Sequence, residues 1–264
     1  MDIQSLRSLL PAVKIAGKMA YQEQSRKKVE RFVKEDGSFV TAVDKNTETF
    51  LVDRIREQFP LANILSEETV FEQKAERDYT FILDPIDGTD VYSQGMAGWS
   101  VSIGLLDHNY LPIAGIVYSP ALKLLFFADI GKGGTINGKK IPLCEQAEPI
   151  TNHTNLMVPA SIHKQMDLSL FPGKIRSIGS AALHLCFPLI YRGVYAAIET
   201  RGTHIWDIAG AHAISRSVGI DLEYFDGTKI EYAALLDGKT VGDTILAGTQ
   251  ERIVALKKFL RRAG

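Results

Sequence analysis

The stretch FILDPIDGTD, residues 81–90, organises the interpretation of the whole chain. The apolar run Tyr79–Leu83 has the composition of a buried strand. Pro85 predicts that the chain leaves the sheet at that point, because proline cannot donate a ladder hydrogen bond. Asp84 and Asp87 are therefore expected three positions apart, just beyond a strand end.

Gly88 and Thr89 follow at once, and this pair suits a tight turn that opens a helix. Carboxylates above such a turn can hold a hard cation such as Mg²⁺, which prefers oxygen ligands. The backbone N–H groups of Gly88 and Thr89 would face an anion bound nearby. A metal beside an anion cradle indicates phosphate chemistry, whereas the structural alternative is an ordinary acidic turn.

Composition narrows the class of protein. The chain has 264 residues and a net charge of −1, which argues against binding nucleic acid or membranes through bulk charge. No targeting segment opens it, and no apolar run approaches the ~18 residues of a membrane span. Cys144 and Cys186 fit no metal or redox spacing. We therefore expect a cytoplasmic protein with free thiols and no nucleic-acid or membrane partner.

Three more acids are candidates for the same cleft. Asp44 precedes an amphipathic helical run, so it is either a helix-capping acid or a cleft carboxylate. Glu67 follows the short strand Asn63–Leu65 and is either solvated or a further metal ligand. Asp207 lies in the first turn of a predicted helix, where the helix dipole alone would favour it.

The predicted secondary structure changes around residues 145–153, from a β-rich half to alternating strands and helices. We expect two halves, residues 1–148 and 149–264. Ser102 and Gly104 alternate with apolar residues and predict a half-buried strand. Periodicity and turn signals predict helices over Ile3–Phe32, from Asp44 to Phe59, over Gly179–Phe187, over Thr203–Val218 and over Gln250–Arg262. They predict strands over Asn63–Leu65, Tyr79–Leu83, Trp99–Leu106, Leu111–Tyr118, Leu124–Ala128, Leu156–Val158, Val194–Ile198 and Thr244–Ala247.

Four separated motifs carry a family resemblance. KEDGSFVTAVD at 34–44 is similar to the pattern KxDxSxVTxxD, and SEE at 66–68 is similar to GEE. DPIDGT at 84–89 and WDIAG at 206–210 match their counterparts. In this order the motifs resemble the inositol monophosphatase family of lithium-sensitive, Mg²⁺-dependent phosphomonoesterases. Relatives of that family include 3′(2′),5′-bisphosphate nucleotidases, fructose-1,6-bisphosphatases and a class of histidinol-phosphatases.

The resemblance implies an α+β and α/β fold, a layered αβαβα sandwich with the site between its halves. It also implies hydrolysis of a small phosphomonoester by metal-activated water, with two or three Mg²⁺ ions, and a homodimer. The residues that it assigns as metal ligands are Glu67, Asp84, the Ile86 carbonyl, Asp87 and Asp207. It assigns phosphate binding to the Gly88 and Thr89 N–H groups, and activation of the water to Asp44, Thr89 and Glu67.

The chain also departs from the family pattern. Asp90 stands where relatives often carry Thr, Lys or Ser, and it is either a first-turn acid or a change in phosphate affinity. Thr200 stands where inositol phosphatases carry a Glu that binds inositol hydroxyls. Arg201 either contacts a second phosphate or forms a surface salt bridge. Together with Ser180, Thr200 and Arg201 are the expected substrate contacts.

Two rival classes remain to be tested. Haloacid-dehalogenase phosphatases also carry DGT, but their motif places its two aspartates two positions apart, whereas Asp84 and Asp87 are three apart. A regulator that binds metal or phosphate without turnover is the non-enzyme alternative. The choice among inositol monophosphate, another sugar or polyol phosphate, a bisphosphate nucleotide and fructose 1,6-bisphosphate stays open.

Overall fold

The structure is a computed structural model. It describes residues 3–26, 29–34, 37, 39–69, 73–74, 77–129, 131–144 and 148–263. Its helices and strands are, in chain order, η1 (Ile3–Leu9), α1 (Leu10–Arg26), β1 (Arg31–Val33), β2 (Phe39–Thr41), α2 (Ala42–Gln58), β3 (Asn63–Ser66), β4 (Thr80–Asp87), α3 (Thr89–Ser93), β5 (Ser100–Leu106), β6 (Pro112–Ser119), β7 (Leu124–Asp129), β8 (Gly133–Ile136), β9 (Lys139–Lys140), β10 (Asn155–Met157), η2 (Ile162–Lys164), β11 (Met166–Asp167), β12 (Lys174–Arg176), α4 (Ala181–Cys186), η3 (Phe187–Leu189), β13 (Val194–Glu199), α5 (Ile205–Arg216), β14 (Asp221–Tyr224), η4 (Tyr232–Leu235), β15 (Ile245–Gly248), α6 (Gln250–Lys257) and β16 (Arg261–Arg262).

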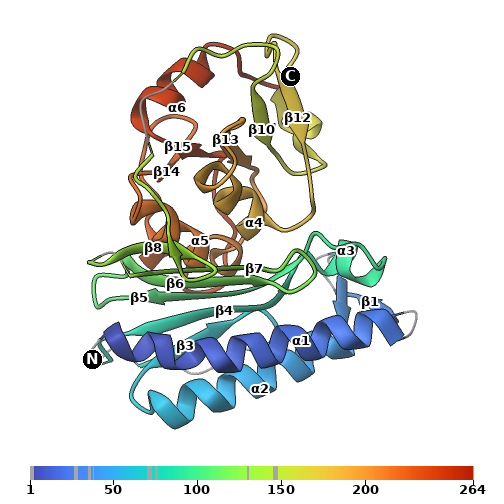
Figure 1. Ribbon diagram of the computed structural model, residues 1–264, viewed down its shortest axis with the longest axis vertical. Coiled ribbons are helices and arrows are strands. Elements are labelled where there is room, and N and C mark those ends of the chain that lie inside the picture. The colour runs from blue at the N-terminus through green and yellow to red at the C-terminus, as the bar shows by residue number, and fades with distance from the viewer. Residues whose placement is uncertain are drawn as a thin grey trace.

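The elements form five layers, as Figure 1 shows. Helices α1 and α2 cover one face of a seven-stranded sheet with the order β3-β4-β5-β6-β7-β8-β9. Helices α4 and α5 lie between that sheet and a five-stranded sheet with the order β12-β10-β13-β15-β14. Helix α6 packs on the outer face of the second sheet. This arrangement confirms the predicted αβαβα sandwich.

The central strand β5 is buried at every position, whereas alternation along it predicted one solvated face. Ser102 and Gly104 provide the polar and small positions of this pattern, and α5 covers the face on which they lie. The expectation was therefore wrong about exposure. Small residues here permit close packing of a helix rather than contact with water.

Three glycines bring α5 unusually close to the first sheet. A Cβ on Gly115 would lie 2.1 Å from the carbonyl oxygen of Gly210, and a Cβ on Gly104 would lie 2.7 Å from the Cβ of Ala209. No real side chain fits at such separations, so the backbones of helix and sheet are in direct contact. This contact fixes the first turn of α5 over the sheet.

The N-terminal helix is shorter than its periodicity predicted. A 3₁₀ turn precedes α1, which ends at Arg26, and Phe32 belongs to strand β1. Along α1, Ala20 is fully buried, whereas Met19 is 47% exposed. At 3.6 residues per turn, Ala20 lies on the same side of the helix as Val13 and Ala16, and Met19 is turned away from that side.

The C-terminal helix also ends earlier than expected. Helix α6 stops at Lys257, and Arg261–Arg262 form β16, which pairs with β11. Asn137 and Gly138 form the turn between β8 and β9, with φ of 49° and 79°, as expected for an Asn-Gly hairpin turn. None of the helices in the described part of the chain is long and apolar enough to cross a membrane.

Candidate metal centre and active site

Strand β4 contains an irregularity that places its two aspartates together. Asp84 pairs with Ser102 and Asp87 pairs with Ser100, so β4 advances three residues while β5 advances two. Residues three apart in a regular strand point to opposite faces, but one extra residue restores the same face. The strand was expected to end at Pro85, and instead it resumes at Asp87 after this bulge.

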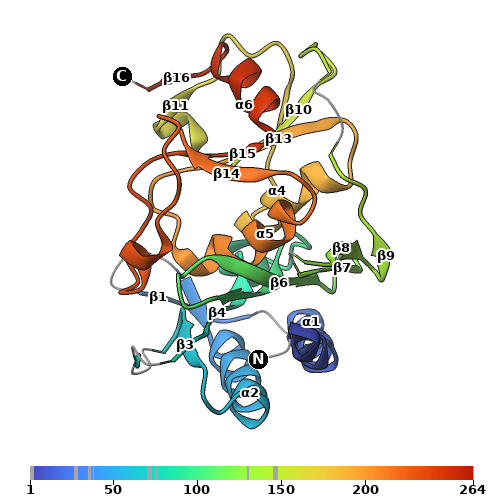
Figure 2. The same cartoon turned by 90° about the vertical axis from the view of Figure 1, so that its left-hand side faces the viewer.

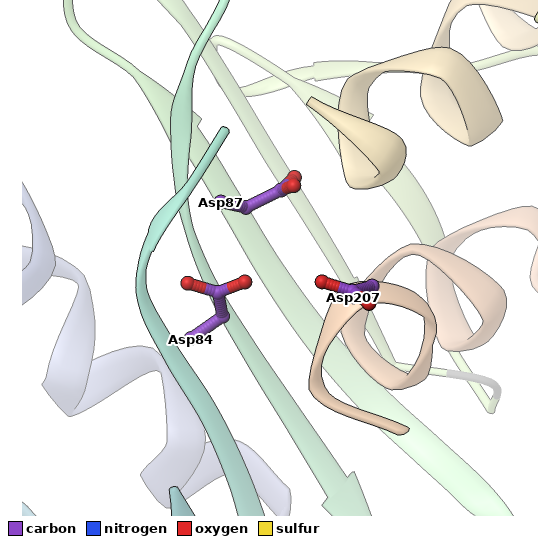
Figure 3. A group of neighbouring side chains, drawn as sticks. All are labelled: Asp84, Asp87 and Asp207. Atoms are coloured by element: carbon purple, nitrogen blue, oxygen red, sulfur yellow. The ribbon is translucent and has the colours of Figure 1, made fainter. Parts of the chain in front are cut away.

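Asp207 approaches the same point from the opposite layer. It lies in the first turn of α5, and its Oδ2 accepts a 2.6 Å hydrogen bond from the His204 backbone N–H. Figure 3 shows its carboxylate directed toward those of Asp84 and Asp87. One oxygen from each of the three lies within 4.8 Å of the others. Two segments far apart in sequence thus converge on one group of three carboxylates.

Two of these carboxylates are buried and Asp207 is partly buried, and none has a lysine or arginine partner among the described residues. Asp84 is 1% exposed and Asp87 is 3% exposed. Among the described residues, no lysine or arginine lies within salt-bridge distance of Asp84, Asp87 or Asp207. Buried charges are normally paired or bound to metal, so this donor set fits a divalent cation with a preference for oxygen.

The pKa values reflect the same crowding. Burial first, and then the charges of Glu67, Asp87 and Asp207, raise the pKa of Asp84 well above its usual value. Burial and the charges of Asp87 and Glu67 do the same to the pKa of Asp207. Burial raises the pKa of Asp87 to about 6, although hydrogen bonds from Ser180 and α4 oppose the rise. Without metal, this group cannot hold all its negative charge at low cost.

Asp87 is held by the N-terminus of α4. Its carboxylate accepts hydrogen bonds from the backbone N–H groups of Ala181 at 3.0 Å and Ala182 at 2.9 Å. The hydroxyls of Ser180 and, at 3.2 Å, Ser100 also donate to it. Helix α4 therefore links the second half of the chain to the central motif and orients one member of the acid group.

Glu67 lies beside the group with a lysine as its partner. Lys34 Nζ is 2.8 Å from Glu67 Oε1 and 2.7 Å from Glu68 Oε1. Burial raises the pKa of Glu67 to about 7, with Lys34 opposing the rise. Burial by itself would lower the pKa of Lys34, but the two glutamates raise it above its usual value. Glu67 is close enough for its charge to raise the pKa of Asp84 and Asp207.

Asp44 combines the two roles that its sequence position left open. It belongs to a capping box at the start of α2, where its Oδ2 accepts from the Thr41 N–H at 2.9 Å and from the Thr41 hydroxyl. Its Oδ1 lies 3.0 Å from the Thr89 hydroxyl oxygen. That hydroxyl is also 3.0 Å from the Ile86 carbonyl oxygen. Burial raises the pKa of Asp44 above its usual value.

Gly88 caps the short helix α3 with a φ of 95°, a backbone conformation that side chains rarely adopt. A Cβ there would lie 3.3 Å from both the Gly98 carbonyl oxygen and the Ser180 nitrogen. Gly88 and Thr89 line a cleft with a volume of about 1100 Å³, together with Ile86 and Asp207. Of the first family-like motif, residues 35, 36 and 38, including Asp36 and Ser38, lie outside the described residues.

The three expected substrate contacts do not lie along this cleft. Ser180 is fully buried, bonded to Asp87 and capping α4. Thr200 is 7% exposed. Arg201 is exposed, and its backbone N–H and C=O bond to the side chain of Gln165 at 2.9 Å each. The structure thus brings the acids and Thr89 together and places Ser180 behind Asp87. Thr200 and Arg201 do not line the cleft.

Comparison with known proteins gives a consistent family assignment. The model of the inositol monophosphatase family matches residues 2–258. The chain is 31% identical over 190 residues to the fructose-1,6-bisphosphatase/inositol-1-monophosphatase of Thermotoga maritima, covering 71% of this chain and 72% of the relative. It is 33% identical over 196 residues to inositol monophosphatase 1 of Bos taurus, covering 68% and 69%. The chain belongs to the inositol monophosphatase family.

The fold agrees with this assignment. The crystal structure of extragenic suppressor protein suhB from Bartonella henselae superposes with a TM-score of 0.82 at 20% identity, covering 97% of each chain. Family membership confirms the predicted enzyme class, a phosphoric monoester hydrolase, and the predicted activity, hydrolysis of a small phosphomonoester. It therefore removes both rival classes.

Several cleft residues were missed by sequence reasoning. His204 and Trp206 stack with ring centroids 4.6 Å apart and planes 9° from parallel, and both line the cleft with Asp237 and Gly238. Trp206 was recognised as part of the WDIAG motif but was assigned no role in the site. Asp237-Gly238 is a turn signal, but a turn signal does not indicate which cavity the turn will border. No local pattern identified these residues as part of the site.

Proposed function

We propose that Mg²⁺ is the cofactor and that Asp84, Asp87 and Asp207 hold it, with Glu67 and the Ile86 carbonyl as further ligands of two or three ions. The observation that carries this proposal is the group of buried carboxylates without a lysine or arginine partner among the described residues. Oxygen donors of this kind suit Mg²⁺ better than softer metals. Bound ions would lower the pKa of a water molecule and neutralise charge on the phosphate and the leaving alcohol.

The protein's own groups would orient the substrate and the attacking water. The backbone N–H groups of Gly88 and Thr89 are placed in the cleft wall, where they would donate to phosphate oxygens. The Thr89 hydroxyl donates its proton to Asp44 Oδ1 or to the Ile86 carbonyl, each 3.0 Å away. The Thr89 oxygen is then an acceptor, which would receive a hydrogen bond from the water.

Asp44 is suited to holding that arrangement. Its other oxygen is occupied by Thr41, so Oδ1 alone is directed at Thr89. A carboxylate fixed in this way keeps the hydroxyl in one orientation and strengthens its basicity as an acceptor. We infer that Asp44 and Thr89 together position the nucleophile and draw its proton away.

The proposed leaving alcohol is inositol or a related sugar or polyol. The relatives from Bos taurus and Thermotoga maritima bear names with inositol monophosphatase activity. A bisphosphate nucleotide is the second candidate, and the observation favouring it is the His204–Trp206 stack in the cleft, since stacked rings can receive a planar base. The same proposal includes lithium sensitivity, a cytoplasmic homodimer and the division into residues 1–148 and 149–264.

Phosphate release with Mg²⁺ tests the proposal directly. The panel is inositol 1-phosphate, fructose 1,6-bisphosphate, 3′-phosphoadenosine 5′-phosphate, histidinol phosphate and glycerol 2-phosphate. We expect inositol 1-phosphate to give the highest kcat/KM, and a preference for the nucleotide would favour the second candidate. Millimolar Mg²⁺ should raise the melting temperature, because it relieves repulsion among the buried acids. An unchanged melting temperature would contradict the assigned ligands.

A further inference from the structure

A second cavity, of about 720 Å³, opens away from the acidic cleft. Its walls come from the β8–β9 hairpin, the segments on both sides of residues 145–147, η3 and its following turn, β13 and α6. Figure 2 shows β9 and β1 on opposite sides of the molecule. Lys34, the residue that follows β1 in the chain, lines the acidic cleft. The two cavities share no lining residue. Whatever occupies the second one does not belong to the phosphatase site.

Most of this cavity's wall is apolar. Ile141, Leu189 and Val218 contribute buried or nearly buried side chains. Its volume lies within the range of about 300–1,000 Å³ typical of small-molecule sites. An apolar wall of that size can hold a ring or a branched chain.

A tyrosine of the same wall carries a buried hydroxyl. Tyr195 lies on β13, lines the cavity and is 6% exposed. Its hydroxyl is buried and has no hydrogen-bond partner among the described residues. Buried polar atoms in native proteins are nearly always bonded, so such an atom calls for a missing acceptor.

An arginine beside it has the same deficiency. Arg252 lies in the first turn of α6, and its guanidinium carbon is 5.4 Å from the Tyr195 ring centroid. Its Nη1 reaches the Tyr195 carbonyl oxygen at 3.3 Å, but its Nε is buried without a partner in the described structure. No carboxylate of the described residues lies within salt-bridge distance of Arg252. A cation and a hydroxyl thus share one wall, and both lack an acceptor.

Two further cations line the cavity, Lys140 and Arg192, against one acid of the described lining, Glu148. Neither cation has a salt bridge to a described residue. With Arg252 the balance is three positive groups to one negative. The excess is the opposite of that in the phosphatase cleft, and it favours an anionic occupant.

We propose that this cavity is a binding site for a small amphipathic organic anion, with an apolar ring or branched chain against the aliphatic wall. One carboxylate, sulfonate or phosphate group of the ligand would accept from Arg252 Nε–H and from the Tyr195 hydroxyl. A simple inorganic anion would leave the apolar wall unused, and a neutral apolar molecule would leave both donors unpaired.

Calorimetric titration with two matched probes tests this proposal on the full chain. The first is naphthalene-2-sulfonate and the second is 2-naphthalenemethanol, which has the same ring system but no charge. We expect one sulfonate per chain and affinity for the neutral probe lower by about tenfold or more. Arg252→Met should weaken sulfonate binding by about tenfold or more, and Tyr195→Phe by a smaller factor. Lys140→Met should weaken it, whereas Lys139→Met, a change at the exposed neighbour outside the lining, should not.

Several results would overturn the proposal. They are the absence of sulfonate binding at millimolar concentration, equal affinity for the two probes, or an Arg252→Met variant that binds as well as the wild type.

The melting temperature of Tyr195→Phe gives an independent test. We expect it to be unchanged or higher without probe, because the hydroxyl has no partner to lose. A clear fall would mean that a structural water satisfies the hydroxyl, and the site would then not be vacant for a ligand. Arg252→Lys, which keeps the charge but lacks Nε–H, should also lose affinity, and retained phosphatase activity would show that each variant is folded.

Discussion

The acidic cleft and the second cavity have unpaired groups of opposite charge. In the cleft, Asp84 and Asp87 are buried and Asp207 is partly buried, and none of the three has a lysine or arginine partner among the described residues. In the second cavity, Arg252 Nε and the Tyr195 hydroxyl are buried donor atoms with no acceptor among the described residues. Burying an unpaired charge or polar group is costly, so each deficiency indicates a ligand of the opposite character. The comparison shows that a missing partner is as informative as a contact.

The strength of the two indications differs. The acids sit on a bulged strand and a helix start that glycine contacts fix in place, and family membership supports a phosphatase site there. The donors of the second cavity rest on two side chains from β13 and α6.

Removal of one acid should cause the largest change. We expect Asp207→Asn to lower kcat/KM by about 1000-fold, or about 4 kcal/mol of transition-state stabilisation. The metal-free protein should melt at the same or a higher temperature, because one buried negative charge is gone. Asp226→Asn, at a fully exposed acid outside the cleft, is the matched control and should leave kcat/KM unchanged. Near-normal turnover of Asp207→Asn would mean that the Asp207 carboxylate is not needed to hold a catalytic metal in the cleft.

The metal-free protein should lose stability as the pH rises. Asp87 has a pKa of about 6 in the folded state against 3.8 as its ordinary value. Its contribution is therefore fully present below pH 3.8 and is lost as the pH rises through about 6, a loss of order 3 kcal/mol. Glu67, with a pKa of about 7, acts in the same direction.

Urea unfolding in EDTA between pH 4.5 and 8 measures this loss. Saturating Mg²⁺ should remove most of the slope, and the Asp87→Asn variant should show a smaller slope without metal. A free energy of unfolding that is independent of pH in EDTA would mean that the acids are not strained. The unpaired acids of the cleft would then give no reason to expect a bound metal.

Sequence reasoning succeeded where chemistry is local. The DPIDGT run, the helix that begins near Asp44 and the first-turn position of Asp207 are visible in residue order alone, because turns and caps depend on neighbours. The layer order followed from the family resemblance. Besides the helix ends, two expectations about the first sheet failed, the end of the sheet at Pro85 and the solvated face of β5. Both depend on what packs against the strand, which no local pattern contains.

The supporting parts of the site were harder to predict for the same reason. Ser180 was expected to contact substrate, but it bonds to Asp87, 93 positions away in sequence. Lys34 pairs with Glu67 across 33 positions. The donors of the second cavity, Tyr195 and Arg252, are ordinary strand and helix residues until the tertiary structure leaves them without acceptors.

The link between Ser180 and Asp87 predicts a moderate effect. Ser180→Ala removes a hydroxyl that donates to Asp87 and should weaken Mg²⁺ binding by about 10- to 100-fold. It also removes the N-cap of α4, which costs about 1 kcal/mol of stability. Thr249→Ala removes the equivalent cap of α6 and is the matched control. Calorimetric Mg²⁺ titration should show weaker binding in the first variant only, and equal affinity in both would assign Ser180 a purely structural role.

Arg201 should give the smallest effect, although its charge made it a candidate for a second phosphate. Its backbone bonds to Gln165 and its side chain is exposed. The hydrogen bond from Arg262 lowers the pKa of Asp243, and the charge of Arg201 adds to that shift. An exposed arginine is not short of partners, because water and nearby acids satisfy it. We therefore expect Arg201→Met to leave kcat/KM for phosphomonoesters within about twofold, as for other surface substitutions. A tenfold loss of kcat/KM confined to substrates with two phosphates would mean that the Arg201 side chain contacts the second phosphate. Burial would then not distinguish the charged residues that bind substrate from those that do not.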